Sequence, residues 1–379
     1  MNPKLSSGGK HLRFGTLLVT LIIPALLVAC FSREPIRLGF IGGLSGRVAD
    51  LGIGGRDGAL LAIELRNASG GVGGRLVELI AEDDQQDTDI AKQAVSRLIN
   101  HKVVAIIGPM TSAMAVATVP LANNAQVLMV SPTVTTTELA GMDDYFLRVI
   151  DSTTAYASRS AGYHFSVQGS RRITVAFDLK NKAYTESWLT DYRKVFEAAG
   201  GAIVEAVPFS SSDDSHFSAL AQRLLQPRPD GVLILANSVD TAILAQQLRK
   251  RDAAVHINAC EWSATERLIE LGGKAVEGVL IAQFIDRESQ QASYVDFRKA
   301  YLERFKREPG FPGLIAFDAT NVVLDGLAAQ THGQTLKNVI LERREFAGAQ
   351  SRIRFDANGD AARDTYLTTV RHGAFVRLP

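Results

Sequence analysis

The feature that most constrains the fold is a repeated alternation of short apolar runs with longer amphipathic segments. From Ile36 onward, short runs rich in Val, Ile and Leu alternate with segments whose apolar residues recur at helical spacing. Nearly continuous apolar strands are typical of a parallel sheet that helices cover on both faces. The alternation therefore predicts an α/β protein. Its first set of predicted strands is 36–42, 75–81, 103–108, 127–131 and 146–150.

The alternation restarts near Asp151 and predicts a second lobe, for which a chain of 379 residues is long enough. Its predicted strands are 171–177, 202–209, 231–236, 254–259 and 278–284; helices follow at 294–308 and 313–330, and a hairpin at 366–379. No low-complexity linker separates the halves, so close backbone crossings should form a hinge. We predict two doubly wound, Rossmann-like lobes with a cleft between them: 34–150 plus 285–358, and 151–284 plus 359–379.

The first residues predict an export signal. Lys4, Lys10 and Arg13 precede an apolar run at 14–29, which is shorter than the roughly 20 residues that span a bilayer as a helix. "LVAC", which ends at Cys30, resembles the bacterial lipobox, in which the cysteine is lipidated after residues 1–29 are removed. Acyl chains on Cys30 would tether the protein to a membrane. An ordinary signal peptide or an uncleaved anchor is the alternative.

Charge and motif content exclude several function classes. The net charge is +1 for the whole chain, and beyond residue 29 the chain has 38 basic and 40 acidic residues, so nucleic acid is not an expected partner. The seven histidines are scattered, no phosphate-binding Gly-x-x-x-x-Gly-Lys-Ser/Thr motif occurs, and no Gly-x-Ser-x-Gly motif occurs. We therefore expect no cofactor, no metal and no enzymatic activity.

Hydroxyl side chains follow two neighbouring strands of the predicted first lobe. Thr111 and Ser112 follow 103–108, and Thr133 and Thr135 follow 127–131, and we predict that a helix begins at each group. Ligands bind outside the carboxyl ends of parallel strands, and a helix N-terminus favours an anion. Helix capping is the other interpretation of these hydroxyls. Their recurrence on adjacent strands favours a ligand. The glycine-rich stretch 43–58 predicts a flexible backbone that a ligand can approach closely.

The second lobe places a carboxylate at a strand end. Glu261 follows 254–259 beside an aromatic residue, where burial is costly unless a cation pairs with the carboxylate. That cation is either Arg267 or a ligand ammonium. Tyr184 and Ser238 lie at two other strand ends of this lobe. Specificity would depend on pocket shape around Leu51, Ser238 and Phe284.

Several ordered segments resemble the leucine/isoleucine/valine-binding protein family. They are "GLSG", "DGALLAIELRNASGGVGGRLVELIAEDD", "AIIGPMTS", "VLMVSPTVTTTEL", "FSALAQRL" and "GGKAVEGVLIA". The resemblance covers Ile36 to the C-terminus and implies the type I periplasmic binding fold of ABC importers. One departure is Leu51, where relatives often have an aromatic residue.

The resemblance implies a clamp for an amino acid. Ser112 and residues 133–135 would hold its carboxylate, Glu261 its ammonium, and Tyr184 would close over it. The implied partners are ABC permease and ATPase subunits, and the implied location is the bacterial periplasm. An amide, urea or aromatic-acid receptor of the same fold, used in transport or sensing, is the alternative.

Overall fold

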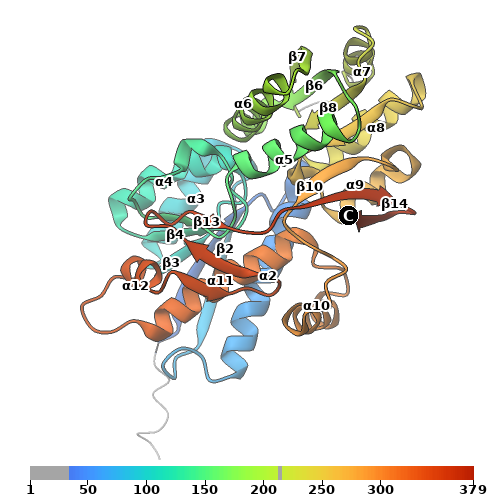
Figure 1. Cartoon of the computed structure of the whole chain (residues 1–379). Helices are drawn as coiled ribbons and strands as arrows, with labels where there is room; N and C mark the ends of the chain where they lie inside the picture. The colour runs from blue at the N-terminus through green and yellow to red at the C-terminus, as the bar shows by residue number, and fades with distance from the viewer. Residues whose placement is uncertain (1–33, 212–215) are drawn as a thin grey trace, which may run out of the picture. The chain divides into compact units, whose positions relative to one another are not determined.

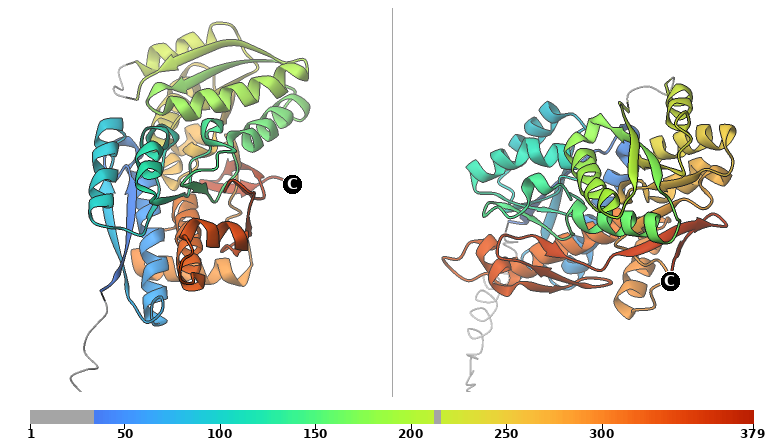
Figure 2. Two further views of the ribbon diagram at one scale, coloured as in Figure 1. Left: turned by 90° about the vertical axis from the view of Figure 1, so that its left-hand side faces the viewer. Right: turned by 45° about the horizontal axis from the view of Figure 1, so that its top comes forward.

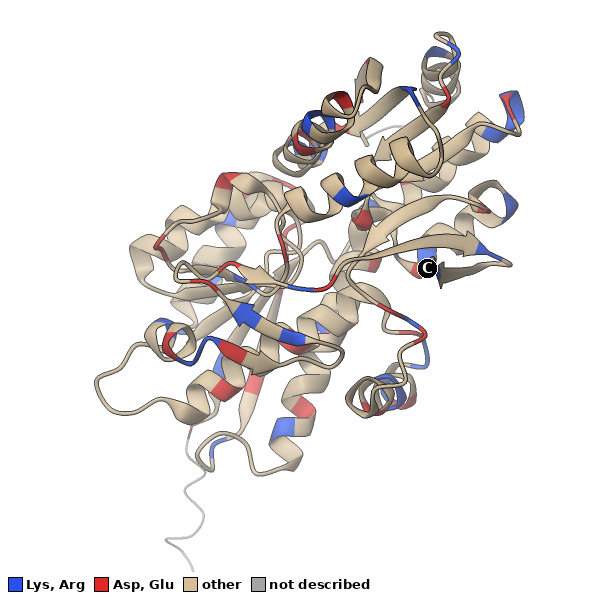
Figure 3. Ribbon diagram, in the orientation of Figure 1, with Lys and Arg blue, Asp and Glu red and all other residues tan. Residues whose placement is uncertain are grey.

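The computed structural model describes residues 34–211 and 216–379 (Figure 1). Residues 36–379 form one structural unit that contains two large β-sheets. The predicted signal peptide and Cys30 lie outside the described residues. Figure 3 shows that Lys and Arg are interspersed with Asp and Glu along the described elements.

The first sheet is parallel throughout, with strand order β2-β1-β3-β4-β5. Its strands are β1 (Ile36–Gly42), β2 (Val77–Asp83), β3 (Ala105–Ile107), β4 (Leu128–Ser131) and β5 (Phe146–Arg148). Successive side chains of β1 enter different clusters, because neighbouring residues of a strand face opposite sides of the sheet. Leu38 and Phe40 join the larger core cluster, whereas Ile41 joins a second one.

Helices cover both faces of this sheet (Figure 2). The second cluster contains apolar residues of α3 (Thr88–Asn100) and α4 (Ser112–Ala125). The larger cluster contains those of α2 (Ala49–Ala68) and α11 (Gly310–Ala329). Both faces of the strands are therefore buried, which is why their sequences are nearly continuous apolar runs.

The second sheet has the order β15-β14-β10-β9-β8-β6-β7. The strands β6 to β10 run parallel, β14 is antiparallel to β10, and β15 is antiparallel to β14. Its strands are β6 (Arg172–Asp178), β7 (Ala202–Phe209), β8 (Gly231–Leu235), β9 (His256–Ala259), β10 (Leu280–Gln283), β14 (Tyr366–Arg371) and β15 (Ala374–Arg377). Its helices are α5 (Thr153–Ser166), α6 (Lys182–Ala198), α7 (Phe217–Leu225), α8 (Ser238–Arg251) and α9 (Glu266–Gly272). The predicted doubly wound α/β class is confirmed.

The chain passes between the two sheets after β5, after β10 and after β13. The segment between β10 and β14 contains α10 (Ala292–Phe305), α11, α12 (Leu336–Arg343) and a small antiparallel sheet of β11 (Glu345–Ala347), β12 (Arg352–Phe355) and β13 (Ala361–Ala362). Short 3₁₀ turns are η2 (Gly46–Val48), η3 (Thr137–Leu139), η4 (Leu179–Asn181), η5 (Glu261–Ser263) and η6 (Gly273–Val276). The predicted C-terminal hairpin is confirmed: β14 pairs with β15, and His372 and Gly373 form the turn with positive φ.

The glycine-rich stretch differs from its prediction. The structure continues α2 back to Ala49, so most of these glycines are helical. A Cβ on Gly52 would lie 2.0 Å from the Gly43 carbonyl oxygen, and one on Gly58 would lie 2.1 Å from that of Gly313 in α11. Close packing of α2 on neighbouring backbone, rather than the approach of a ligand, therefore explains these two glycines.

The helix α11 is a core element. Of the described helices, it is the one long and apolar enough to cross a membrane, and 72% of the window that meets this test is buried inside the protein. Such burial is typical of a core helix, and α11 packs directly on α2.

Candidate ligand-binding site

One cavity is lined by residues that follow strands of both large sheets. The space between its lining side chains that no atom occupies is about 310 Å³, open solvent included. The lining residues are Leu51, Met110, Thr111, Ser112, Thr133, Thr135, Asn181, Tyr184, Glu261, Trp262, Phe284 and Phe311. The structure thus brings together every predicted ligand-binding residue except Ser238.

On one wall, two threonine hydroxyls lie buried without a partner. Thr111 is the N-cap residue of α4, but its side chain makes no capping hydrogen bond. Its Oγ1 and that of Thr135 are buried and have no hydrogen-bond partner in the described structure. An unpaired buried polar group is destabilising. The Thr111 side chain therefore does not cap α4, and the hydroxyls of Thr111 and Thr135 remain unpartnered in the cavity lining.

The other hydroxyls of this wall have structural partners. Ser112 Oγ accepts a hydrogen bond from the Thr136 backbone N–H at 3.4 Å. Thr133 Oγ1 donates to the Met110 carbonyl oxygen at 2.6 Å. The α4 N-terminus itself leaves backbone N–H groups without intrahelical partners. One of these, the Ala113 N–H, donates to Asn181 Oδ1 at 2.9 Å.

The predicted second helix N-terminus is wrong. Where the sequence predicted a helix over 135–140, the structure has only the 3₁₀ turn η3. Consecutive threonines disfavour a helix because their branched side chains lose χ1 freedom there. Thr136 caps this turn by accepting a hydrogen bond from the Glu138 N–H at 3.2 Å. Of the two hydroxyl groups on this wall, only Thr111 and Ser112 therefore lie at an α-helix N-terminus, that of α4.

On the opposite wall, Glu261 is a buried carboxylate. Its Oε2 accepts a hydrogen bond from Trp188 Nε1 at 2.9 Å, whereas Oε1 is buried and has no hydrogen-bond partner in the described structure. Burial raises the pKa of Glu261 to about 7. Arg267, the suggested protein cation, instead pairs with Glu270 at 3.1 Å. No Lys, Arg or His is among the described residues that line the cavity.

Aromatic and apolar side chains fill the space between these walls. The Tyr184 ring meets Trp262 edge-on at 5.6 Å between centroids, and Phe284 meets Phe311 in the same way at 5.4 Å. Tyr184 OH and Trp262 Nε1 are buried without hydrogen-bond partners in the described structure. Burial raises the pKa of Tyr184 well above its usual value, so the phenol stays neutral. These two groups offer further hydrogen bonds to a ligand.

Ser238 lies outside the cavity and bridges the two sides of the cleft. Its Oγ donates to Asp50 Oδ2 at 2.6 Å, and Thr265 donates to the same carboxylate oxygen. Beside them, Arg47 pairs with Asp240 at 2.6 Å. Asp50 belongs to α2, on the first sheet, whereas Ser238 and Asp240 begin α8 on the second. These contacts hold the two sides together beside the cavity.

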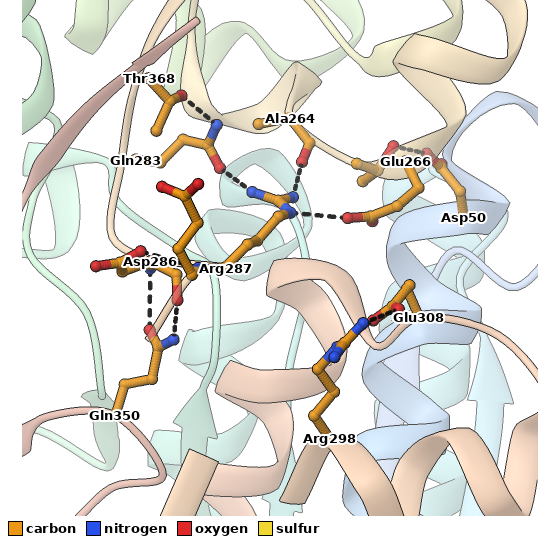
Figure 4. A network of polar contacts seen from close by, with 12 residues as sticks. Asp50, Ala264, Glu266, Gln283, Asp286, Arg287, Arg298, Glu308, Gln350 and Thr368 are labelled. Carbon is orange, nitrogen blue, oxygen red and sulfur yellow. Dashed lines mark hydrogen bonds and ion pairs between the residues drawn. The ribbon is translucent and has the colours of Figure 1, made fainter. Parts of the chain in front are cut away.

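A polar network braces the segment that follows Glu261 (Figure 4). Arg287, just beyond β10, donates to the Ala264 carbonyl oxygen at 2.8 Å, to Gln283 Oε1 at 2.6 Å and to Glu266 Oε1 at 2.9 Å. Gln283 in turn donates to Thr368 of β14 at 2.6 Å. One arginine thus ties the end of η5 to the strand edges around it.

Sequence reasoning missed Met110, Asn181, Trp188, Trp262 and Phe311. Trp262 and Asn181 lie at strand ends, where the same rule could have found them. Trp188 is inside a helix, and its pairing with Glu261 depends on how α6 packs on the second sheet, which no local pattern indicates.

Comparison with known proteins places this geometry in context. A sequence model of the family described as periplasmic binding protein matches residues 35–374. The chain is 23% identical over 357 residues to the leucine-, isoleucine-, valine-, threonine-, and alanine-binding protein of Pseudomonas aeruginosa. This match covers 91% of this chain and 94% of that protein.

Solved structures show the same fold. A leucine binding protein from Thermotoga maritima aligns with a TM-score of 0.84 and 26% identity, over 91% of this chain and 98% of that one. An ABC transporter solute binding protein from R. palustris, solved in complex with benzoate, aligns with a TM-score of 0.82 and 18% identity, over 91% and 95%.

Proposed function

The chain belongs to the periplasmic binding protein family, and from that premise we propose that it is the extracytoplasmic solute-binding component of an ABC importer for an amino acid. The family implies a periplasmic location and partnership with permease and ATPase subunits. Lipid attachment at Cys30 and the lobe boundaries predicted from the sequence belong to the same proposal.

The observation that supports the proposal is that the two walls of one cavity favour opposite charges on a ligand. Glu261 is a buried carboxylate with an unpartnered oxygen and no described cation beside it. The facing wall has the α4 N-terminus and two unpartnered hydroxyls. A zwitterion supplies an ammonium to the first wall and a carboxylate to the second. The apolar side chains between the walls favour an apolar amino-acid side chain.

Contact with both walls explains how binding would favour closure. A ligand stabilises whichever conformation gives it more contacts, and only the closed cleft brings both walls to one molecule. The contacts of Ser238 and Arg47 across the cleft support the same state. Because the closed conformation differs from the open one, the membrane subunits can distinguish the ligand-bound protein from the empty one.

The test is binding of the twenty amino acids, measured by thermal shift and then calorimetry, for wild type and Glu261→Gln. We expect wild type to bind at least one apolar amino acid, and the variant to lose about 30-fold or more in affinity, because a buried charge pair loses one partner. Glu270→Gln, an exposed carboxyl in the same lobe, is the matched control and should bind as wild type does. Unchanged affinity in Glu261→Gln would contradict the proposal.

An aromatic acid is the second candidate ligand. Phe284, Phe311 and Trp262 line the cavity, and the structural neighbour from R. palustris was solved with benzoate. Because the pKa of Glu261 is about 7, its protonated form could donate to a ligand carboxylate. Benzoate affinity should then rise as pH falls from 8 to 6, whereas amino-acid affinity should fall. The sign of this slope in calorimetry separates the two candidates.

A further inference from the structure

The hydrogen-bond partner of Glu261 is held by a column of stacked aromatic rings on α6. Trp188 stacks on Tyr192 at 5.5 Å with 16° between the ring planes, and Tyr192 stacks on Phe196 at 5.3 Å with 25°. Residues four apart lie on one face of a helix, so the three rings follow each other along α6. All three side chains are fully buried.

The column is fixed at its far end as well. Tyr192 OH is 2.7 Å from His164 Nδ1, and Phe165 meets Phe196 edge-on at 6.1 Å. Burial lowers the pKa of His164 to about 3, so its ring is neutral at neutral pH. The indole of Trp188 therefore has little freedom, and its N–H direction is set by packing rather than by Glu261.

We infer that Trp188 is a positioning residue for ligand binding: its indole N–H holds Oε2 of Glu261, which turns Oε1 toward the cavity and favours the ionised carboxylate. The inference rests on the proposed role of Glu261 toward a ligand ammonium. The distance of 2.9 Å and full burial of both groups make the bond charge-assisted when Glu261 is ionised.

Few other groups compete for this carboxylate. The titratable groups that face it are Tyr184 of α6, Tyr156 of α5 and Cys260 beside it in the chain. Burial raises the pKa of both tyrosines and raises that of Cys260 to about 12, so all three are neutral near pH 7. The ionised carboxylate thus depends on donated hydrogen bonds: its own backbone N–H and the Trp188 indole N–H both lower its pKa, and the Trp188 bond, at 2.9 Å, is the one that comes from another element.

The first test needs no ligand. The sequence contains two tryptophans, Trp188 and Trp262, so the protein should show two indole N–H resonances in a ¹⁵N–¹H spectrum. The resonance that is missing from the spectrum of Trp188→Phe belongs to Trp188, and the other belongs to Trp262. We expect the Trp188 resonance to shift with a midpoint near pH 7, and the shift to vanish in Glu261→Gln. A Trp188 resonance that is constant from pH 5 to 9 would overturn the inference.

The second test separates positioning from simple structural support. Trp188→Phe keeps a ring to stack on Tyr192 and removes the donor. Loss of one hydrogen bond to the ionised form raises the pKa by about one unit. Amino-acid affinity should therefore fall about fivefold at pH 7 and less than twofold at pH 9. A role in packing alone would weaken binding by the same factor at both pH values.

Tyr192→Phe is the matched control, because it removes a buried hydrogen bond one turn away without touching Glu261. It should lower stability and leave the pH dependence of binding unchanged. The two hypotheses fail differently. If no amino acid binds wild type, the proposed function fails and the indole titration still tests Trp188. If Glu261→Gln abolishes binding while Trp188→Phe leaves its pH dependence unchanged, only the positioning role is wrong.

Discussion

At the scale of single residues, burial of the Glu261 carboxylate lowers the stability of the folded protein, and the same carboxylate is the one proposed to bind a ligand ammonium. Its buried Oε1 lacks a partner, and burial raises its pKa from 4.5 to about 7. The folded protein therefore binds a proton here more tightly than the unfolded chain does. Between those two pH values, folding becomes less favourable as pH rises, because the folded state holds protons that the unfolded chain has lost.

The corresponding prediction concerns stability in the absence of ligand. From pH 4.5 to pH 7 the contribution of Glu261 should destabilise the protein by roughly 3 kcal/mol, and Glu261→Gln should remove that part of the slope. Urea denaturation at a series of pH values measures this. Asp84, whose pKa burial raises to about 6, contributes in the same direction and persists in the variant. An identical slope above pH 6 in both proteins would refute the assignment.

Strand-end reasoning predicted the cavity residues well, because the carboxyl ends of parallel strands meet at one edge of each sheet. Thr111, Thr135 and Glu261 illustrate this success. Ser238 illustrates its limit: it follows β8 as expected, yet its hydroxyl bonds to Asp50 from the other lobe. Which strand-end side chains face the cavity depends on the closure of the cleft, which no single strand encodes.

At the scale of elements, α2 shows why helix boundaries are hard to predict in glycine-rich sequence. Glycine is unfavourable in a helix, so the sequence indicated a flexible backbone over 43–58, whereas α2 begins at Ala49 within that stretch. Contact with α11 and the end of β1 overrides local propensity. By contrast, α3 has a local start signal, because the Asp87 side chain caps it by accepting hydrogen bonds from the Asp89 and Ile90 N–H groups.

A matched pair of substitutions tests this packing. Gly58→Ala should destabilise the protein by about 2 kcal/mol or more, because the new Cβ would collide with the Gly313 backbone. Gly162→Ala, in α5, places its Cβ in open space and should stabilise by up to about 1 kcal/mol. Thermal and urea denaturation compare them. Equal effects in the two variants would show that α2 does not need the close approach.

At the scale of the whole described unit, the alternation of strands and helices predicted two doubly wound sheets, because each strand must be covered on both faces. It could not predict contacts across the cleft, which join residues such as Arg47 and Asp240 that are remote in sequence. The contacts Arg47–Asp240 and Ser238–Asp50 are polar. Because the Asp240 carboxylate is buried, its attraction to Arg47 is offset by the cost of removing that carboxylate from water, and a small net free energy suits a cleft that opens and closes.

Removing one such contact should shift the balance toward the open cleft. Arg47→Ala is expected to weaken ligand binding about three- to tenfold, mainly through faster dissociation, because the closed state loses its pair with the buried Asp240 carboxylate. Stopped-flow kinetics measure both rates. Arg193→Ala, which breaks an exposed pair within α6, is the control and should leave both rates unchanged. A slower association with unchanged dissociation would contradict the prediction that the Arg47–Asp240 pair stabilises the closed cleft.

Both tryptophans of the chain adjoin the cavity, one in its lining and the other bonded to Glu261. Indole emission responds to the polarity and charge of its surroundings. Tryptophan fluorescence of this protein therefore comes from two indoles that adjoin the cavity. If the proposed ligand binds in this cavity, its binding should change the intrinsic fluorescence, so that candidate ligands can be compared without a dye or an engineered fluorophore.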